Sequence, residues 1–239
     1  MEFTGEQVVL GTSKQRLVDE DIARYRFVSS FVKGKKILDI ASGTGIGCML
    51  FSSVAQEVVG VDISNESISY ALTHNAAPNV RYILGSADDS SLFPAASFDV
   101  ISSLETIEHL EDSARKTYLA NLASWLRPEG VLILSTPNKR ITSPFSQKPE
   151  NKYHVLEFTR EKLEEEIVEH FTVEQWLGQR SIPKTLAWPI VRRLVNILQV
   201  ICRRNFHIYT LSGSAEVLSY DDRRIEPRIF VVVLKKHKN

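Results

Sequence analysis

The chain has 239 residues, 43% of them hydrophobic, so it is long enough to bury one sizeable core. Lys plus Arg and Asp plus Glu each number 29, which excludes a strong overall field of the kind that attracts nucleic acid or an anionic membrane. Its two cysteines, Cys48 and Cys202, exclude a disulfide framework and favour a reducing, cytoplasmic location, and we find neither a signal-peptide pattern nor an apolar run of 18 residues.

The first predicted element is a helix over residues 16–32, where apolar side chains recur at helical spacing before Gly34. Strand signals follow in chain order, and helical patterns separate the first five of them. Alternating strands and helices predict an α/β fold with a doubly wound, mostly parallel sheet, whose ligands lie at the carboxyl ends of the strands. The predicted strands are 37–40, 58–62, 80–84, 98–102, 131–136, 173–176 and 229–234.

A glycine-rich turn follows the first strand. This strand carries Asp39 near its end and is followed by Gly43 and Gly45, where a backbone without Cβ atoms can turn tightly and approach a ligand. The next strand ends at Asp62, whose carboxylate is placed to accept hydrogen bonds from both ribose hydroxyls of an adenosine. The pair of strand ends therefore predicts a nucleoside site.

The same turn indicates which nucleoside cofactor binds. A dinucleotide pattern that begins at Gly43 would need a glycine where Cys48 stands, and Asp39 would repel a diphosphate but attract an ammonium group. We therefore predict S-adenosylmethionine as the cofactor. The stretch resembles motif I of the class I methyltransferases, with Ala41 in place of the usual first glycine. This resemblance implies a single Rossmann-like methyltransferase domain over residues 1–239, with a seven-stranded sheet and an antiparallel last strand.

The segment after the third strand reads Gly-Ser-Ala-Asp from Gly85 to Asp88. A loop at this place can offer backbone and side-chain groups to the adenine edge of the cofactor. In the family that the chain resembles, the segment often reads Gly-Asp-Ala, so that Ser86 replaces the customary acid. We expect Ser86, Ala87 and Asp88 to contact the cofactor, with Asp88 as the source of the carboxylate.

Three chemically active side chains follow the fourth strand. If the segment forms one helical turn, Glu105, Glu108 and His109 share a face. Two carboxylates on one face repel each other unless a proton or a cation neutralises them, and Mg²⁺ prefers oxygen ligands of this kind. The spacing therefore predicts a divalent-metal site. His154 follows the loop after the fifth strand and is the fourth candidate.

The Glu-x-x-Glu-His pattern, with a distant His ahead of Glu-Phe-Thr-Arg, resembles the metal site of plant small-RNA 2′-O-methyltransferases, and ubiquinone-pathway O-methyltransferases carry a similar set. The resemblance implies Glu105, Glu108, His109 and His154 as metal ligands, and Glu108, His109 and His154 as catalytic residues. Two alternatives stay open: Glu108 as the partner of an arginine, and His109 as a metal-free general base.

The substrates of those two groups of enzymes share a vicinal pair of hydroxyls that can chelate one ion. Much of the chain, including residues 102–109 and 135–138, is also similar to bacterial methyltransferases of surface-polysaccharide and other glycan pathways. We therefore expect metal-assisted O-methylation of a sugar or another vicinal diol, and polysaccharide biosynthesis as its setting. The alternatives are RNA 2′-O-methylation, which the neutral charge disfavours, methylation of a quinone-pathway catechol, and an inactive cofactor-binding regulator.

A helical insertion is predicted over residues 181–214, before the last strand. Within it, residues 186–201 place apolar side chains on one helical face and basic side chains on the other, with Trp188 near the start. Three interpretations stay open for this helix: a lid, a homodimer contact, or a peripheral membrane contact that would suit a lipid-linked glycan or a quinone.

Overall fold

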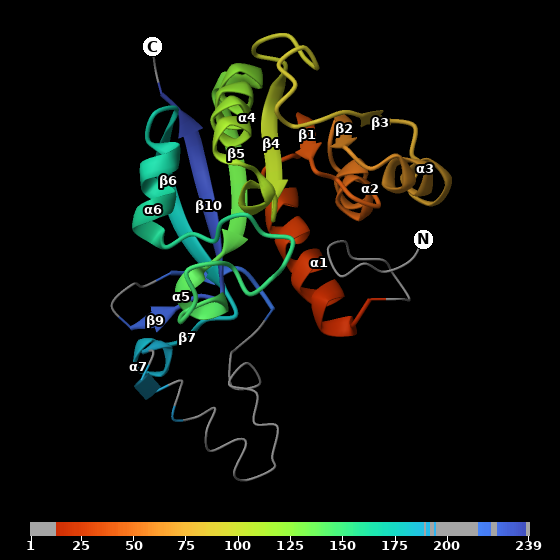
Figure 1. Ribbon diagram of the computed structural model, residues 1–239. Helices are drawn as coiled ribbons and strands as arrows, with labels where there is room; N and C mark the ends of the chain where they lie inside the picture. Colours follow the sequence, from red (N-terminus) through yellow and green to blue (C-terminus); the bar gives the residue numbers. More distant parts are fainter. Residues whose placement is uncertain (1–12, 189, 192–193, 195–214, 221–223, 238–239) are drawn as a thin grey trace.

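The computed structural model describes residues 13–188, 190–191, 194, 215–220 and 224–237. Its main feature is a sheet in the order β3-β2-β1-β4-β5-β10-β6-β8, with helices on both faces (Figure 1). The strands of this sheet are β1 (Lys36–Ile40), β2 (Glu57–Asp62), β3 (Val80–Leu84), β4 (Phe98–Leu104), β5 (Leu126–Pro137), β6 (Phe171–Gln179), β8 (Leu218–Ser219) and β10 (Ile229–Lys236). A short pair, β7 (Ile182–Pro183) and β9 (Ile225–Glu226), lies outside it.

The sheet confirms the predicted α/β class. Strands β1 to β5 run parallel, and β10 pairs antiparallel with both β5 and β6. All seven predicted strands are present, and the antiparallel last strand is confirmed. The two-residue strand β8 adds to the edge at β6 and was not predicted, because two residues give no periodic signal.

The helices between the strands are α1 (Gln15–Ser29), α2 (Ile46–Ser52), α3 (Asn65–His74), α4 (Asp112–Trp125), α5 (Lys139–Thr142), α6 (Arg160–Ile167) and α7 (Lys184–Ala187). The prediction that helices separate the first five strands is wrong at one place. Residues 85–97, which the structure describes throughout, connect β3 to β4 without a helix. Asp89 accepts hydrogen bonds from Ser91 and so favours a turn, and Pro94 disfavours a continuous helix.

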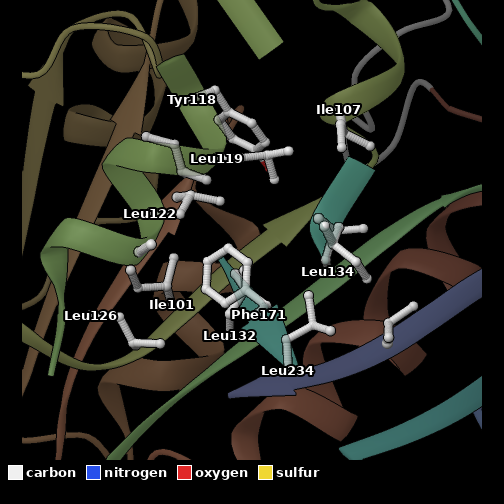
Figure 2. Packing of buried hydrophobic residues seen from close by; sticks show 14 of the residues in the cluster. Ile101, Ile107, Tyr118, Leu119, Leu122, Leu126, Leu132, Leu134, Phe171 and Leu234 are labelled. Carbon is white, nitrogen blue, oxygen red and sulfur yellow. The ribbon is translucent and has the colours of Figure 1, made fainter. Parts of the chain in front are cut away.

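Side-chain alternation along β1 divides the core between the two faces of the sheet. Leu38 and Ile40 join a cluster with α4 and α6, and Ile37 joins a second cluster with α1 and α2. Figure 2 shows the first cluster, in which Tyr118, Leu119 and Leu122 of α4 point toward the sheet. Both faces are therefore covered, as a parallel sheet requires.

The position of Asp39 follows from the same alternation. It lies on the face that packs against α2, where Cys48 donates to its carboxylate. Because the parallel strands end at one edge, three parts of the chain meet there: Asp62 at the end of β2, residues 105–109 after β4, and Pro137 at the end of β5. This edge carries the site.

The predicted helical insertion lies largely outside the described residues, including most of the helix at 186–201. Within the described part of the insertion, α7 ends at Ala187, and Trp188 follows it with 62% of its surface exposed. None of the helices in the described part of the chain is both long and apolar enough to span a membrane.

Candidate functional site

A cavity of about 780 Å³ lies at the carboxyl edge of the sheet. Its wall is built by α1, the turn after β1, the end of β2, the segment after β3, the segment after β4, and residues 142–157. These elements are far apart in the sequence and meet because parallel strands bring their carboxyl ends together. Most of the predicted site residues line this cavity: Ala41, Gly43, Asp62, Ser86, Ala87, Glu105, His109 and His154.

The turn after β1 requires left-handed backbone at several positions. The φ angles are 59° at Ala41, 53° at Gly43 and 81° at Gly45. Glycine adopts these angles without strain, whereas an alanine there costs about 1 to 2 kcal/mol. Ala41 therefore departs from the usual glycine in two ways: it adds a methyl group, and it holds a left-handed backbone conformation that is strained for alanine. Gly45 turns away from the cavity, and a Cβ atom there would lie 2.4 Å from the hydroxyl of Tyr82.

Asp62 is fixed by the backbone around it. Its Oδ2 accepts a hydrogen bond from the amide of Gly43 at 2.8 Å, and its Oδ1 accepts one from the amide of Ser64 at 2.8 Å. Burial raises the pKa of Asp62, while these two amide bonds oppose that rise. Each carboxylate oxygen has further lone-pair capacity, so the carboxylate faces the cavity in a fixed orientation with acceptors still available.

Besides Gly45, two predicted cofactor residues lie away from the cavity wall. Asp39 is 1% exposed and accepts a hydrogen bond from Ser102 Oγ as well as from Cys48. Burial raises the pKa of Asp39 to about 7. Asp88 accepts a hydrogen bond from Ser86 Oγ, so the structure places Ser86 at the wall and Asp88 behind it.

The segment after β4 is not one continuous helical turn. Glu105 has a φ of 52°, and a 3-10 helix over Ile107–His109 begins only two residues later. The predicted shared face is therefore wrong for Glu105, because its left-handed backbone changes the direction of the chain. Glu105 Oε1 accepts a hydrogen bond from Ser135 Oγ at 2.7 Å, and Glu105 lines the cavity. A bulky residue held in this conformation is a local strain of the kind found at functional sites.

Glu108 is completely buried. Its Oε2 accepts a hydrogen bond from Thr136 Oγ1 at 2.9 Å, whereas its Oε1 finds no hydrogen-bond partner among the described residues. Burial, and then the nearby charge of Glu105, raises the pKa of Glu108 well above its ordinary value. A buried carboxylate oxygen without a partner is energetically costly, so a proton or a cation at this place would stabilise the site.

Two imidazoles lie beside Glu108. One candidate ligand atom from each of Glu108, His109 and His154 lies within 4.8 Å of the others. The rings of His109 and His154 meet edge to face, with their centroids 4.9 Å apart. His109 Nδ1 donates to the carbonyl of Tyr153 at 3.1 Å, which leaves the lone pair of the neutral ring on Nε2. The structure therefore brings three of the four predicted ligands together, and Glu105 lies outside this group.

Helix α1 contributes a charged pair to the cavity wall. Arg24 donates to Asp21 and, at 2.6 Å, to Gln179 Oε1, and it is 4% exposed. Within the described part of the chain, Arg24 Nε, Ser42 Oγ and Glu108 Oε1 are the buried side-chain atoms without a hydrogen-bond partner. Arg24 and Ser42 line the cavity, and Glu108 adjoins His109. The buried polar atoms that lack a hydrogen-bond partner in the described residues therefore lie around one cavity.

Two further residues of the site were not assigned from the sequence. Ile63 follows Asp62 with 75% of its surface exposed at the cavity wall, and an apolar residue directly after the predicted ribose-binding acid was an available signal. Glu157 accepts a hydrogen bond from His154 Nδ1 at 2.9 Å. It stands three residues after His154 within the quoted Glu-Phe-Thr-Arg pattern, but the sequence alone did not show that the two side chains meet.

Comparisons with known proteins indicate a methyltransferase. Residues 37–130 match a family model described as a methyltransferase domain. The chain is 29% identical over 178 residues to a probable S-adenosylmethionine-dependent methyltransferase of Mycolicibacterium smegmatis. This alignment covers 74% of this chain and 67% of that protein. It is 33% identical over 112 residues to a ubiquinone biosynthesis O-methyltransferase of Thiobacillus denitrificans, covering 46% and 47% of the two chains.

Two Mycobacterium tuberculosis relatives match over 57% of their own length, so the chain corresponds to little more than half of each. Solved structures share the fold. The PH0226 protein of Pyrococcus horikoshii has a TM-score of 0.63 and 18% identity, covering 94% of this chain and 93% of the other. An S-adenosylmethionine dependent methyltransferase of Mesorhizobium loti has a TM-score of 0.61 and 15% identity, covering 90% and 97%.

Proposed function

Because the chain is a class I S-adenosylmethionine-dependent methyltransferase, we propose that it transfers the methyl group to a hydroxyl of a vicinal diol, with help from a divalent cation. The observation that carries this proposal is the buried carboxylate of Glu108, whose Oε1 finds no partner in the described part of the chain, next to two imidazoles. Carboxylate oxygens are ligands for hard ions such as Mg²⁺ and Mn²⁺, and neutral imidazole nitrogens favour transition metals, so this mixed set suits Mn²⁺ or another first-row divalent ion better than Mg²⁺.

The donor set fits a small divalent ion with modest adjustment. Ligand atoms around such an ion lie about 3 Å from one another, so atoms within 4.8 Å must move inward by small side-chain rotations. Glu105 lies outside the group of three but close enough to raise the pKa of Glu108, and to serve as the fourth ligand its carboxylate would have to leave Ser135. Two carboxylates and two neutral rings would balance the charge of a divalent cation.

A bound cation would supply acidity, by lowering the pKa of an acceptor hydroxyl, and would hold the two oxygens of a diol in a fixed position. The protein's own groups then have two tasks. Glu108, His109 and His154 would hold the cation, and they would thereby fix the acceptor end of the cavity; the proton of the acceptor hydroxyl would pass to solvent, because the lone pair of His109 Nε2 would be on the cation. Positioning the oxygen in line with the methyl group is expected to supply most of the rate gain.

The acceptor class rests on two supports. A chelated diol suits the cluster of Glu108, His109 and His154, and the relatives named ubiquinone biosynthesis O-methyltransferases align with 46% of the chain. Sugars and catechols both carry adjacent hydroxyls. We propose a sugar or glycan unit first and a catechol second, since the resemblance to glycan-pathway enzymes covers more of the sequence.

A metal-free mechanism is the second candidate, and the bond from His109 Nδ1 to the Tyr153 carbonyl favours it. This bond orients the ring, so that His109 could act as a general base without a cation. Methyl transfer would then survive chelation. The two candidates therefore differ in whether methyl transfer depends on a divalent cation.

The test is Mn²⁺ binding to chelator-treated protein in the presence of S-adenosylhomocysteine, followed by electron paramagnetic resonance. We expect one bound ion in the wild type and none in Glu108→Gln, which keeps the shape of the side chain but removes its charge. Glu165→Gln is the matched control, because Glu165 is an exposed carboxylate on α6. Absence of Mn²⁺ binding in the wild type would reject the metal proposal.

Methyl transfer to a panel of diols then tests the acceptor. The panel contains catechol, 3,4-dihydroxybenzoate, ribose 5-phosphate and free hexoses, each compared with its singly hydroxylated analogue. We expect transfer to at least one diol, greater activity with Mn²⁺ than after chelation, and no transfer to the analogue. Equal rates after chelation would favour His109 as a metal-free base.

A further inference from the structure

The methyl-transfer proposal assigns no role to Glu157, a buried acid at the edge of the cavity. The side chain is 2% exposed and accepts a hydrogen bond from His154 Nδ1 at 2.9 Å. Its other oxygen accepts a hydrogen bond from Thr142 Oγ1 at 2.5 Å. Burial acts to raise the pKa of Glu157, but hydrogen bonds from His154, Ser143 and Thr142 lower it.

This bond decides which nitrogen of His154 carries the hydrogen. A carboxylate can only accept, so Nδ1 must donate to Glu157, and the lone pair of the neutral ring is then on Nε2. Asn151 Nδ2 donates to this Nε2 at 2.9 Å. The imidazole is thus held at both nitrogens, and Asn151 must release Nε2 before this nitrogen can bind a cation.

The backbone fixes the place of this ring relative to Glu108. The amides of Val155 and Leu156 both donate to the carbonyl of Glu108, at 2.8 Å and 3.1 Å. Thr142 and Ser143 hold the carboxylate of Glu157 from the other side, at the end of α5. Glu157 therefore connects His154 to a segment that does not itself contain a proposed ligand.

We propose that Glu157 is a positioning residue, which keeps the ring of His154 in one orientation and in the tautomer whose lone pair is on Nε2. The use of that nitrogen as a metal ligand rests on the proposed function. Carboxylates that hold ligand histidines in this way orient the ring and increase its basicity, and their removal typically costs 10- to 100-fold in metal affinity. The tautomer, in contrast, is a property of the protein alone.

The first experiment measures the tautomer directly. Protein labelled with ¹⁵N-histidine is studied without metal at about pH 8, above the ordinary histidine pKa of about 6.5, by long-range ¹H–¹⁵N correlation spectra. The signals of His154 are identified by their loss in His154→Gln. We expect the Nδ1–H form in the wild type and a mixture of the two forms in Glu157→Gln, because a neutral amide can also donate to the ring. An Nε2–H ring in the wild type would overturn the proposal.

The wild-type spectrum answers the question even if Glu157→Gln fails to fold. The matched control is Glu161→Gln, since Glu161 is an exposed acid that pairs with Arg140 on the surface. We expect this control to keep the wild-type tautomer. If a folded Glu157→Gln protein also keeps a single Nδ1–H form, Glu157 does not position the ring.

The second experiment measures Mn²⁺ affinity in the same proteins. We expect Glu157→Gln to bind Mn²⁺ about 10- to 100-fold more weakly, with S-adenosylhomocysteine affinity unchanged. Equal Mn²⁺ affinity would overturn the positioning role. A wild type that shows the Nδ1–H ring but binds no Mn²⁺ would reject the metal function alone, so the two failures are distinguishable.

Discussion

The cavity has two sides that are built in different ways. The nucleoside side consists of the turn at residues 41–45, Asp62 and residues 85–87, and the histidine side consists of residues 105–109 and 151–157. On the nucleoside side, both carboxylate oxygens of Asp62 accept backbone hydrogen bonds at 2.8 Å. On the histidine side, Glu108 Oε1 finds no partner in the described part of the chain. The fold alone satisfies the carboxylate of Asp62, whereas the carboxylate of Glu108 needs a proton, a cation or a ligand.

This difference predicts that the nucleoside side sets the affinity for the cofactor and that the histidine side carries out the chemical step. A carboxylate already fixed by two amides loses little freedom when a ribose binds, so the nucleoside side suits tight and specific binding. A buried carboxylate that still lacks a hydrogen-bond partner among the described residues, such as that of Glu108, suits the chemical step, in which charge changes. Variants on the two sides should therefore change different measurements.

The largest effect is expected for Glu108→Gln, in methyl transfer to the best diol of the panel. Removal of the charge should lower the rate by about 10³-fold, within the range for loss of a catalytic proton-transfer or metal-assisted step. The affinity for S-adenosylhomocysteine, measured by calorimetry, should stay unchanged, as it should in Glu165→Gln. A parallel loss of cofactor affinity would mean that the two sides are not separate.

Asp62→Asn should give the opposite pattern. The ribose would lose charge-assisted hydrogen bonds, which are worth about 1.5 to 3 kcal/mol, so the dissociation constant should rise by up to about 100-fold. S-adenosylhomocysteine and 5′-methylthioadenosine should be affected equally, because both contain the ribose. Mn²⁺ affinity should not change, and a loss of Mn²⁺ binding would contradict the separation.

The nucleoside side was largely predictable from the sequence. Gly43 and Asp62 follow strands with clear apolar patterns, and the contact between them joins neighbouring strand ends. The direction of Asp39 could also have been deduced, since alternation along β1 places it toward α2. The motif and the attraction of an ammonium group favour the cofactor as the partner of Asp39, whereas this alternation favours α2.

The histidine side was predictable only in its residue types. The left-handed backbone of Glu105 separates it from the helical turn of Glu108, and no local spacing rule indicates such an angle. The contact of His154 with Glu157 depends on amides that bind the carbonyl of Glu108, which are long-range contacts. Sequence patterns describe local periodicity, so they name these side chains without showing how they are oriented.

A third prediction concerns the stability of the nucleoside side. Burial raises the pKa of Asp39 to about 7, compared with 3.8 for the ordinary group, so the folded protein binds this proton more tightly than the unfolded chain. The stabilisation is full below pH 3.8 and is lost as the pH rises to about 7. Asp39→Asn lacks this titration, so its free energy of unfolding relative to wild type should rise by about 2 kcal/mol from pH 5 to pH 7.

Urea unfolding of the wild type and of Asp39→Asn between pH 5 and pH 7 tests the sign of this pH dependence. The difference between the two proteins cancels the other titrating groups, provided that the substitution leaves them unchanged. A difference that stays constant between pH 5 and pH 7 would show that Asp39 titrates outside this range.

The smallest effect is expected for Arg24→Met, which tests how α1 joins the two sides. Arg24 lines the cavity, is 4% exposed and has an Nε that is without a hydrogen-bond partner in the described part of the chain. A guanidinium in this position suits the carboxylate of the cofactor's amino-acid end. Its loss should weaken S-adenosylhomocysteine binding by about 10-fold, or about 1.4 kcal/mol, and leave 5′-methylthioadenosine binding unchanged, because that ligand lacks the amino-acid end.

Arg81→Met provides the matched control, since Arg81 is exposed on β3. Arg24 also donates to Asp21 and Gln179, so its removal could loosen the contact of α1 with β6 and weaken the binding of both ligands. Calorimetry with the two ligands separates these causes. A selective loss of S-adenosylhomocysteine affinity indicates that Arg24 contacts the amino-acid end directly. Equal losses for the two ligands indicate that Arg24 acts by holding α1 against the cavity. In that case α1 supports the nucleoside side as a whole.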